Sequence, residues 1–134
     1  MAVYTKISKK EILYINKKFE VDRIIKFNGI KQGIENTNYL LKSKNNKFIL
    51  TIFEKRVSQK EIPFFMKLMD QLNNLKINCP KPLKNKSGNY QIRIKNKMAS
   101  IVSFLDGKDK KKLNLKNCFD IGKIIAQMHL SSKK

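Results

Sequence analysis

The chain has 134 residues, a length typical of one compact domain, and 41% of them are hydrophobic while 30% are charged. This composition is too apolar for a fully disordered chain, and no apolar run approaches the roughly 20 residues that span a bilayer. The 30 Lys and Arg residues outnumber the 10 Asp and Glu residues and give a net charge of +20, which favours polyanions such as nucleic acid or nucleotide phosphates.

The lysine excess has two interpretations. Only three of the 30 basic residues are arginine, the side chain that nucleic-acid sites usually recruit. Lys, Asn and Ile share AT-rich codons, so a biased genome can produce the same composition. We favour that origin and keep a basic nucleic-acid-binding module as an alternative. Residues 1–10 lack the hydrophobic core of a signal peptide, which predicts a cytoplasmic protein without a membrane partner.

The first half of the chain is predicted to form one helix and three strands. Ser8 and Glu11 have the spacing of a capping box, and apolar residues recur at helical spacing up to Phe19. β-Forming residues then gather in three runs, separated by turn signals at Asn28-Gly29 and Asn45-Asn46. These runs predict strands over residues 21–30, 35–43 and 47–54.

The second half is predicted to form a helix, two strands and a last helix. Ser58 and Glu61 repeat the capping-box spacing before an apolar stripe, although Pro63 requires this helix to start late or to kink. A proline-containing connector follows the helix, and a basic loop over residues 108–112 precedes the last helix. The predicted elements are a helix over 58–75, an extended connector over 78–82, strands over 90–94 and 98–104, and a helix over 115–130.

This order predicts an α+β fold of the protein-kinase-like small-lobe type. A five-stranded antiparallel sheet with a packed helix forms the expected nucleotide-binding lobe over residues 1–105. Residues 106–134 are expected to supply a hinge or linker and the first helix of a large lobe. In such lobes the first two strands and their turn cover the nucleotide phosphates, and the third strand carries a cation for them. The helix carries a carboxylate that orients this cation, and the hinge backbone after the fifth strand holds the adenine.

Several segments carry a more specific signal. They are Phe27-Asn28-Gly29-Ile30, residues 33–41, residues 48–57, Ile62-Pro63-Phe64-Phe65, Cys79-Pro80-Lys81-Pro82, residues 101–107 and residues 122–130. In this order they resemble the bacterial homoserine kinases that are related to aminoglycoside and choline kinases. The resemblance implies transfer of the ATP γ-phosphate to the hydroxyl of L-homoserine, a step of threonine biosynthesis. A kinase of the same fold for another small hydroxyl substrate, such as choline or an aminoglycoside, is the alternative.

Residues 29–38 are the candidate phosphate-binding stretch, since they lie between two predicted strands. They contain Gly29, Gly33, Asn36 and Asn38. Glycine backbones can approach phosphates closely and present N–H groups to them, so we assign these four residues to nucleotide binding. An ordinary hairpin with turn residues is the alternative, because no GxGxxG motif is present.

The cation of the third strand is absent from its usual place. Many relatives have Lys or Arg where this chain has Thr51, so Lys55, just past the strand, is the predicted substitute, with Arg56 as its neighbour. In the following helix Glu61 is the candidate for the orienting carboxylate, and helix capping is its alternative role. At the hinge, the resemblance assigns Ser103, Phe104 and Leu105 to the adenine.

No catalytic or metal-binding residue is predicted in this chain. The family takes its catalytic base and Mg²⁺ ligands from a His-Gly-Asp loop with a downstream Asn and a later Asp, but no acidic residue follows Asp120. We therefore expect the amino-terminal portion of a kinase, with the Mg²⁺ ligands in a missing lobe and the oligomeric state left open. The single histidine, His129, is predicted to pack in the core, as are Cys79 and Cys118.

Overall fold

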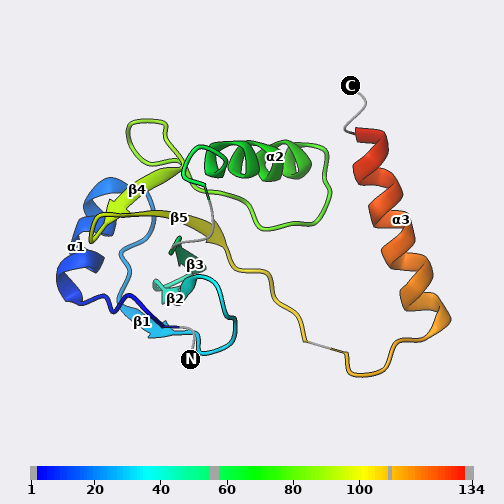
Figure 1. The fold of residues 1–134 in the computed structure, drawn as a ribbon, viewed down its shortest axis with the longest axis horizontal. Coiled ribbons are helices and arrows are strands. Elements are labelled where there is room, and N and C mark those ends of the chain that lie inside the picture. The colour runs from blue at the N-terminus through cyan, green and yellow to red at the C-terminus, as the bar shows by residue number, and fades with distance from the viewer. Residues whose placement is uncertain (1–2, 55–57, 109, 132–134) are drawn as a thin grey trace.

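A computed structural model describes residues 3–54, 58–108 and 110–131 of the chain (Figure 1). Its helices and strands follow the predicted order. They are α1 (Lys9–Lys18), β1 (Lys26–Gly29), β2 (Thr37–Lys42), β3 (Lys47–Ile52), α2 (Ile62–Asn74), β4 (Gln91–Ile94), β5 (Lys97–Ser103) and α3 (Leu115–Ser131).

The strands form one five-stranded sheet in the order β1-β2-β3-β5-β4, and every neighbouring pair is antiparallel. Short connections join β1 to β2, β2 to β3 and β4 to β5. The longer connection through α2 leads from β3 to the edge strand β4, so that β5 returns to the sheet between β3 and β4. The predicted antiparallel sheet of five strands is confirmed.

One face of the sheet packs against α1 and carries the main core. Alternate residues along a strand point to opposite faces, and paired residues of neighbouring strands share a face. The apolar side chains on this face are buried with those of α1, and we call it the α1 face. Its buried cluster includes Ile12, Ile15, Phe19, Tyr39, Leu41, Phe48, Leu50, Ile52, Ala99 and Ile101.

The opposite face, here called the second face, is more open. Leu40, Ile49 and Val102 are consecutive partners across β2, β3 and β5 and form a half-buried apolar row. Asn38 and Thr51 pair beside this row and are also half-buried. The second face therefore offers an apolar surface with polar side chains next to it.

The prediction of a turn at Asn28-Gly29 is wrong. Both residues lie inside β1, where they pair with Leu40 and Tyr39. The chain reverses in residues 30–36 instead, and this loop is closed by a hydrogen bond of 2.8 Å from the Ile30 N–H to the Asn38 carbonyl. An Asn-Gly pair can therefore lie at the end of a strand instead of in a turn, because pairing with β2 satisfies the backbone N–H and C=O groups of the pair.

A two-residue turn with positive φ angles does occur in the sheet, between β4 and β5. Lys95 and Asn96 have φ angles of 48° and 64°, the conformation of a type I′ hairpin turn. The predicted reversal at Asn45-Asn46 also joins two strands, and the Ser43 N–H donates to the Asn46 carbonyl at 2.9 Å. Within the described residues, neither Asn45 nor Asn46 has a positive φ.

The two predicted capping boxes have different outcomes. At α1, the Lys10 N–H donates to the Ser8 hydroxyl at 3.2 Å and the Glu11 carboxylate accepts from the Ser8 N–H at 2.7 Å, so the box is confirmed. The box predicted at Ser58 and Glu61 is wrong, because α2 starts late, with Glu61 itself as the N-cap and no side-chain cap bond. Pro63 lies in the first turn of α2, where its missing N–H leaves no helical bond unmade.

The last helix, α3, stands apart from the sheet, and none of its described residues is buried (Figure 1). Cys118 and His129 are exposed on it, so the prediction that both are buried is wrong. Cys79, in the extended connector after α2, is half-buried, and the same connector pairs with β5 through Pro82 and Val102. No helix in the described parts of the chain has the length and apolarity needed to cross a membrane.

Candidate functional site

The loop over residues 30–36 is an exposed turn between β1 and β2. Residues 31–35 are exposed, and the side chain of Ile34 is 80% exposed. Gly33 has a φ of 104°, a conformation that residues with a Cβ rarely adopt. The stretch predicted to bind phosphates is therefore an exposed turn in which Gly33 adopts a positive φ, and its role in phosphate binding stays a prediction.

Gly29, at the start of this loop, has a packing role in the structure. A Cβ on Gly29 would lie 2.9 Å from Cγ2 of Val3, so a larger residue would force the Val3 side chain or the segment that carries it to shift. The absence of a side chain here brings residues 3–5 close to the sheet. The role of Gly29 in phosphate binding stays a prediction.

Asn38 and Thr51 form a neutral pair on the second face. The Thr51 hydroxyl donates to Oδ1 of Asn38 at 2.8 Å across β2 and β3. Asn36 is engaged at the end of the same strands, where its Oδ1 accepts from the Glu54 N–H at 3.3 Å. Lys55 and Arg56, the predicted cation and its neighbour, lie outside the described residues.

Some polar groups of the hinge residues form hydrogen bonds with other residues of the same lobe. The Ser103 N–H donates to the Lys81 carbonyl at 2.8 Å, and the Ser103 hydroxyl accepts from the Lys81 N–H at 2.9 Å. The Phe104 N–H donates to the Lys47 carbonyl at 3.1 Å, while Nζ of Lys47 lies 5.2 Å from the Phe104 ring centre. These two hinge N–H groups are therefore not available to a ligand. Leu105, the next residue along the chain, is 41% exposed.

The two carboxylates of the α2 region differ in surroundings. Glu61 is exposed at the N-cap of the helix. Asp70, inside the helix, accepts a hydrogen bond of 2.6 Å from the Tyr90 hydroxyl and lies 3.7 Å from Nζ of Lys84. The hydrogen bond to Asp70 raises the pKa of Tyr90. Asp70 thus ties α2 to the segment before β4, and Glu61 is the carboxylate left exposed.

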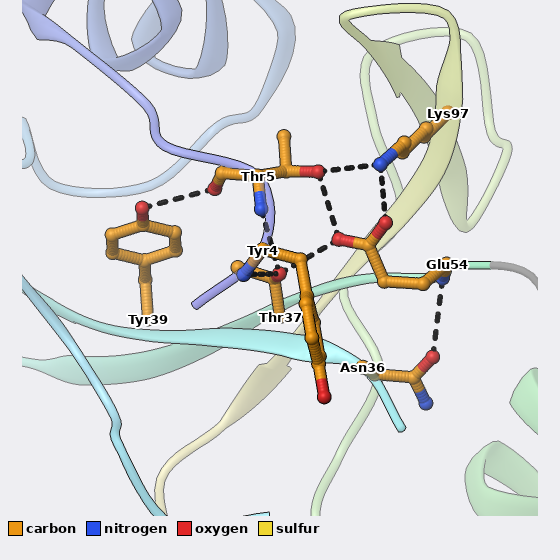
Figure 2. Close-up of polar contacts among 7 residues, drawn as sticks. All are labelled: Tyr4, Thr5, Asn36, Thr37, Tyr39, Glu54 and Lys97. Carbon is orange, nitrogen blue, oxygen red and sulfur yellow. Dashed lines mark hydrogen bonds and ion pairs between the residues drawn. The ribbon is translucent and has the colours of Figure 1, made fainter. Parts of the chain in front are cut away.

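A polar cluster at Glu54 was not predicted from the sequence. The hydroxyls of Thr5 and Thr37 donate to Oε1 of Glu54 at 2.8 and 2.7 Å, and the Lys97 ammonium pairs with Oε2 (Figure 2). Burial raises the pKa of Glu54, but the hydrogen bonds from Lys97, Thr37 and Thr5 outweigh it and hold the pKa below its ordinary value. Its partners lie 17 to 49 positions away in the sequence, so no local spacing signals the cluster.

The described residues do not fit a metal site. Nowhere in residues 3–54, 58–108 and 110–131 do three His, Cys, Asp or Glu side chains gather in a group that could hold a metal ion. Mg²⁺ ligands are therefore not assigned to this part of the chain, and no chemical step is derived through the ion.

Comparison with known proteins gives three findings. A family model described as "Phosphotransferase enzyme family" matches residues 26–134. Homoserine kinases of Rhodopseudomonas palustris (strain TIE-1) and Agrobacterium fabrum (strain C58) are 36% and 38% identical to the chain over 133 residues, which is 99% of the chain in each case. The chain spans about 41% of the length of each of these relatives.

The third finding concerns the fold. The crystal structure of a spectinomycin phosphotransferase in complex with ADP and spectinomycin matches with a TM-score of 0.75 at 14% identity. The match covers 95% of this chain and 39% of that one. The two chains therefore share a fold, and the predicted kinase-like small lobe is confirmed.

Proposed function

Because the chain belongs to the phosphotransferase enzyme family, we propose that it forms the nucleotide-binding lobe of an ATP-dependent kinase. The observation that carries the proposal is the family match over residues 26–134, which spans the sheet, the exposed loop and the hinge. L-homoserine is the proposed phosphate acceptor, since the two relatives described above are homoserine kinases. The cytoplasm is the proposed location of this reaction.

The second face and the loop beside it suit the two ends of ATP. The apolar row of Leu40, Ile49 and Val102 provides a surface against which an adenine ring can pack. The exposed backbone around Gly33 lies at the end of β1 and β2, where N–H groups can meet phosphate oxygens. The division into a lobe over residues 1–105 and a hinge with a first large-lobe helix over residues 106–134 is part of this proposal.

The proposed reaction moves the γ-phosphoryl group of ATP to the hydroxyl of L-homoserine. An O–P bond forms at the acceptor, the bond to the leaving ADP breaks, and the hydroxyl proton passes to a base. No residue of the described chain is assigned to that base. The proposed contribution of this lobe is to bind and orient ATP, with Mg²⁺ as the expected companion ion.

Nucleotide binding is tested on the chain by calorimetry with ATP. We expect ATP to bind, and Lys55→Ala to weaken binding about ten- to a hundredfold, because a charge-assisted hydrogen bond contributes roughly 1.5–3 kcal/mol. Lys86→Ala is the matched control, since Lys86 is an exposed lysine in the turn that precedes β4 and is not assigned to the nucleotide site. Equal losses for Lys55→Ala and Lys86→Ala would show that the overall positive charge, not a local site, attracts the nucleotide.

The acceptor is tested on the product of the complete reading frame. We expect ATP-dependent phosphorylation of L-homoserine and none of choline or an aminoglycoside. The 134-residue chain alone is expected to give no turnover, since no catalytic base is assigned in it. If the enzyme phosphorylated choline or an aminoglycoside but not L-homoserine, the proposal of a kinase would stand and the proposal of L-homoserine as the acceptor would be wrong.

A further inference from the structure

The N-terminal segment contacts both ends and the middle of the loop over residues 30–36. Val3 packs against Gly29, the last residue before the loop. The Tyr4 hydroxyl donates to the Ile34 carbonyl at 2.9 Å, within the loop itself. The N–H groups of Tyr4 and Thr5 both donate to the Thr37 hydroxyl at 3.0 Å, directly after the loop.

The same segment is fixed to the sheet by buried groups (Figure 2). The Tyr39 hydroxyl donates to the Thr5 carbonyl at 3.0 Å and accepts from the Ile7 N–H at 3.1 Å. The Thr5 hydroxyl donates to Glu54 and lies 2.7 Å from the Lys97 ammonium, which donates to it. Thr5 is 6% exposed, and the side chain of Glu54 is 10% exposed.

The contacts of this segment with Thr37, Tyr39 and Lys97 lie on the α1 face, on the opposite side of the sheet from the surface proposed for ATP. Thr37 precedes Tyr39 and Leu41 by even steps along β2, and Lys97 precedes Ala99 by an even step along β5, so all share the α1 face. Asn38 and Thr51 point to the second face. The contacts can therefore hold the loop without touching a nucleotide bound on the second face.

We propose that Tyr4, Thr5, Thr37, Glu54 and Lys97 form a clamp that holds the loop over residues 30–36 in the position required for phosphate binding. The proposal rests on the proposed nucleotide-binding function. Tyr4 and Thr5 are then positioning residues, which act through the loop backbone. A loop with exposed residues and a glycine has many accessible conformations. Because the clamp fixes Ile34 and Thr37 in the protein without nucleotide, less conformational entropy is lost when the phosphates bind.

The sharpest test is Tyr4→Phe, which removes the hydroxyl that binds Ile34. The Tyr4 side chain is 57% exposed, so this change leaves the core intact. Calorimetry on the chain is expected to show ATP binding weakened about two- to tenfold, the range of one hydrogen bond, with adenosine binding unchanged. Tyr14→Phe is the matched control, since Tyr14 lies on α1 at 37% exposure, away from the loop, and should bind both ligands as the wild type does.

A second pair of variants tests the buried end of the clamp. Thr5→Val removes the hydroxyl that contacts Glu54 and Lys97, while Thr5→Ser keeps it. We expect Thr5→Val to weaken ATP binding and Thr5→Ser to bind ATP with nearly the affinity of the wild type. Amide hydrogen exchange of residues 31–35 should quicken in Tyr4→Phe and Thr5→Val without nucleotide present.

The outcomes separate the clamp from the function on which it rests. If the wild-type chain binds ATP and Tyr4→Phe binds it equally well, the clamp is wrong and the proposed function stands. Equal weakening of ATP and adenosine would also overturn the clamp, because it would reflect a general loss of structure. A wild-type chain that does not bind ATP overturns the proposed function and the role of the clamp together.

Discussion

Glu54 is a charged residue held inside the lobe, with 10% of its side chain exposed. A carboxylate out of water is unstable unless donors replace the lost hydration. Two threonine hydroxyls and the Lys97 ammonium supply those donors. They stabilise the ionised form, and the pKa of Glu54 is lowered even though burial raises it.

This shift predicts an acid-dependent loss of stability. The folded pKa lies below the ordinary value of 4.5, so the stabilisation is complete above pH 4.5 and is lost as the pH falls through the lowered pKa. Glu54→Gln should therefore lower the free energy of unfolding at pH 7 by about 1.5–3 kcal/mol, the range for hydrogen bonds to charged groups. At pH 3 the difference from the wild type should be smaller, as measured by urea unfolding.

Glu11→Gln is the control for this acid dependence. The pKa of Glu11 is also lowered, by hydrogen bonds from the Ser8 hydroxyl and N–H, but the residue is at the surface end of α1. Glutamine can keep the bond of a capping box, so the loss at pH 7 should be smaller than for Glu54→Gln. Equal losses of Glu54→Gln at pH 7 and pH 3 would contradict the role given to its charge.

At the scale of elements, local patterns in the sequence were sufficient to predict each helix and strand found in the described parts of the chain. Runs of β-formers and apolar stripes at helical spacing act over short stretches of sequence. Most elements lie within two residues of the predicted bounds, but β1 begins five residues and α2 four residues after the predicted start. The errors lie where local signals compete with long-range pairing. Asn28-Gly29 continues β1 because β2 supplies partners, and Ser58 caps nothing because α2 begins at Ile62.

Local sequence patterns also predicted part of the candidate site, but not the contacts between residues far apart in the sequence. The loop with Gly33 and the hinge after β5 follow from the order of the elements, while the clamp joins residues up to 92 positions apart and has no local spacing. The exposure of His129 was also beyond sequence reasoning. An apolar stripe on α3 predicts burial, but whether another surface meets that stripe is not encoded in the helix itself.

The capping boxes give a prediction at this scale. Ser8→Ala should lower the free energy of unfolding by about 1 kcal/mol, because it removes the side-chain acceptor of the first turn of α1. Ser58→Ala should change it by less than about 0.5 kcal/mol, as an exposed substitution away from any cap. The midpoints of urea unfolding at an unchanged m-value measure both effects. A comparable loss in the two variants would mean that Ser58 does cap α2 in solution.

At the scale of the whole molecule, an uncovered apolar stripe coexists with a strong positive charge. Ile121, Ile124 and Ile125 lie on one side of α3 and are 47%, 44% and 47% exposed. A pocket of about 400 Å³ lies between the length of α2 and the C-terminal end of α3, lined by residues that include Phe64, Leu72, Met128 and His129. Exposed apolar patches favour association, whereas a net charge of +20 opposes it through repulsion between chains.

The balance between these two forces predicts how association depends on salt. Added salt screens the repulsion within about 10 Å at 0.1 M and leaves apolar burial intact, so self-association of the chain should increase between 50 and 500 mM NaCl. Sedimentation velocity measures this change.

Replacing Ile124 and Ile125 together by Gln should weaken association more than tenfold, since burying each isoleucine is worth roughly 1.5–3 kcal/mol. Lys123→Gln, on the opposite side of α3, is the control, and it should associate at least as strongly as the wild type because it carries less charge. Association that decreases with salt, or that persists unchanged in the double variant, would show that charged groups rather than the stripe on α3 bring the chains together.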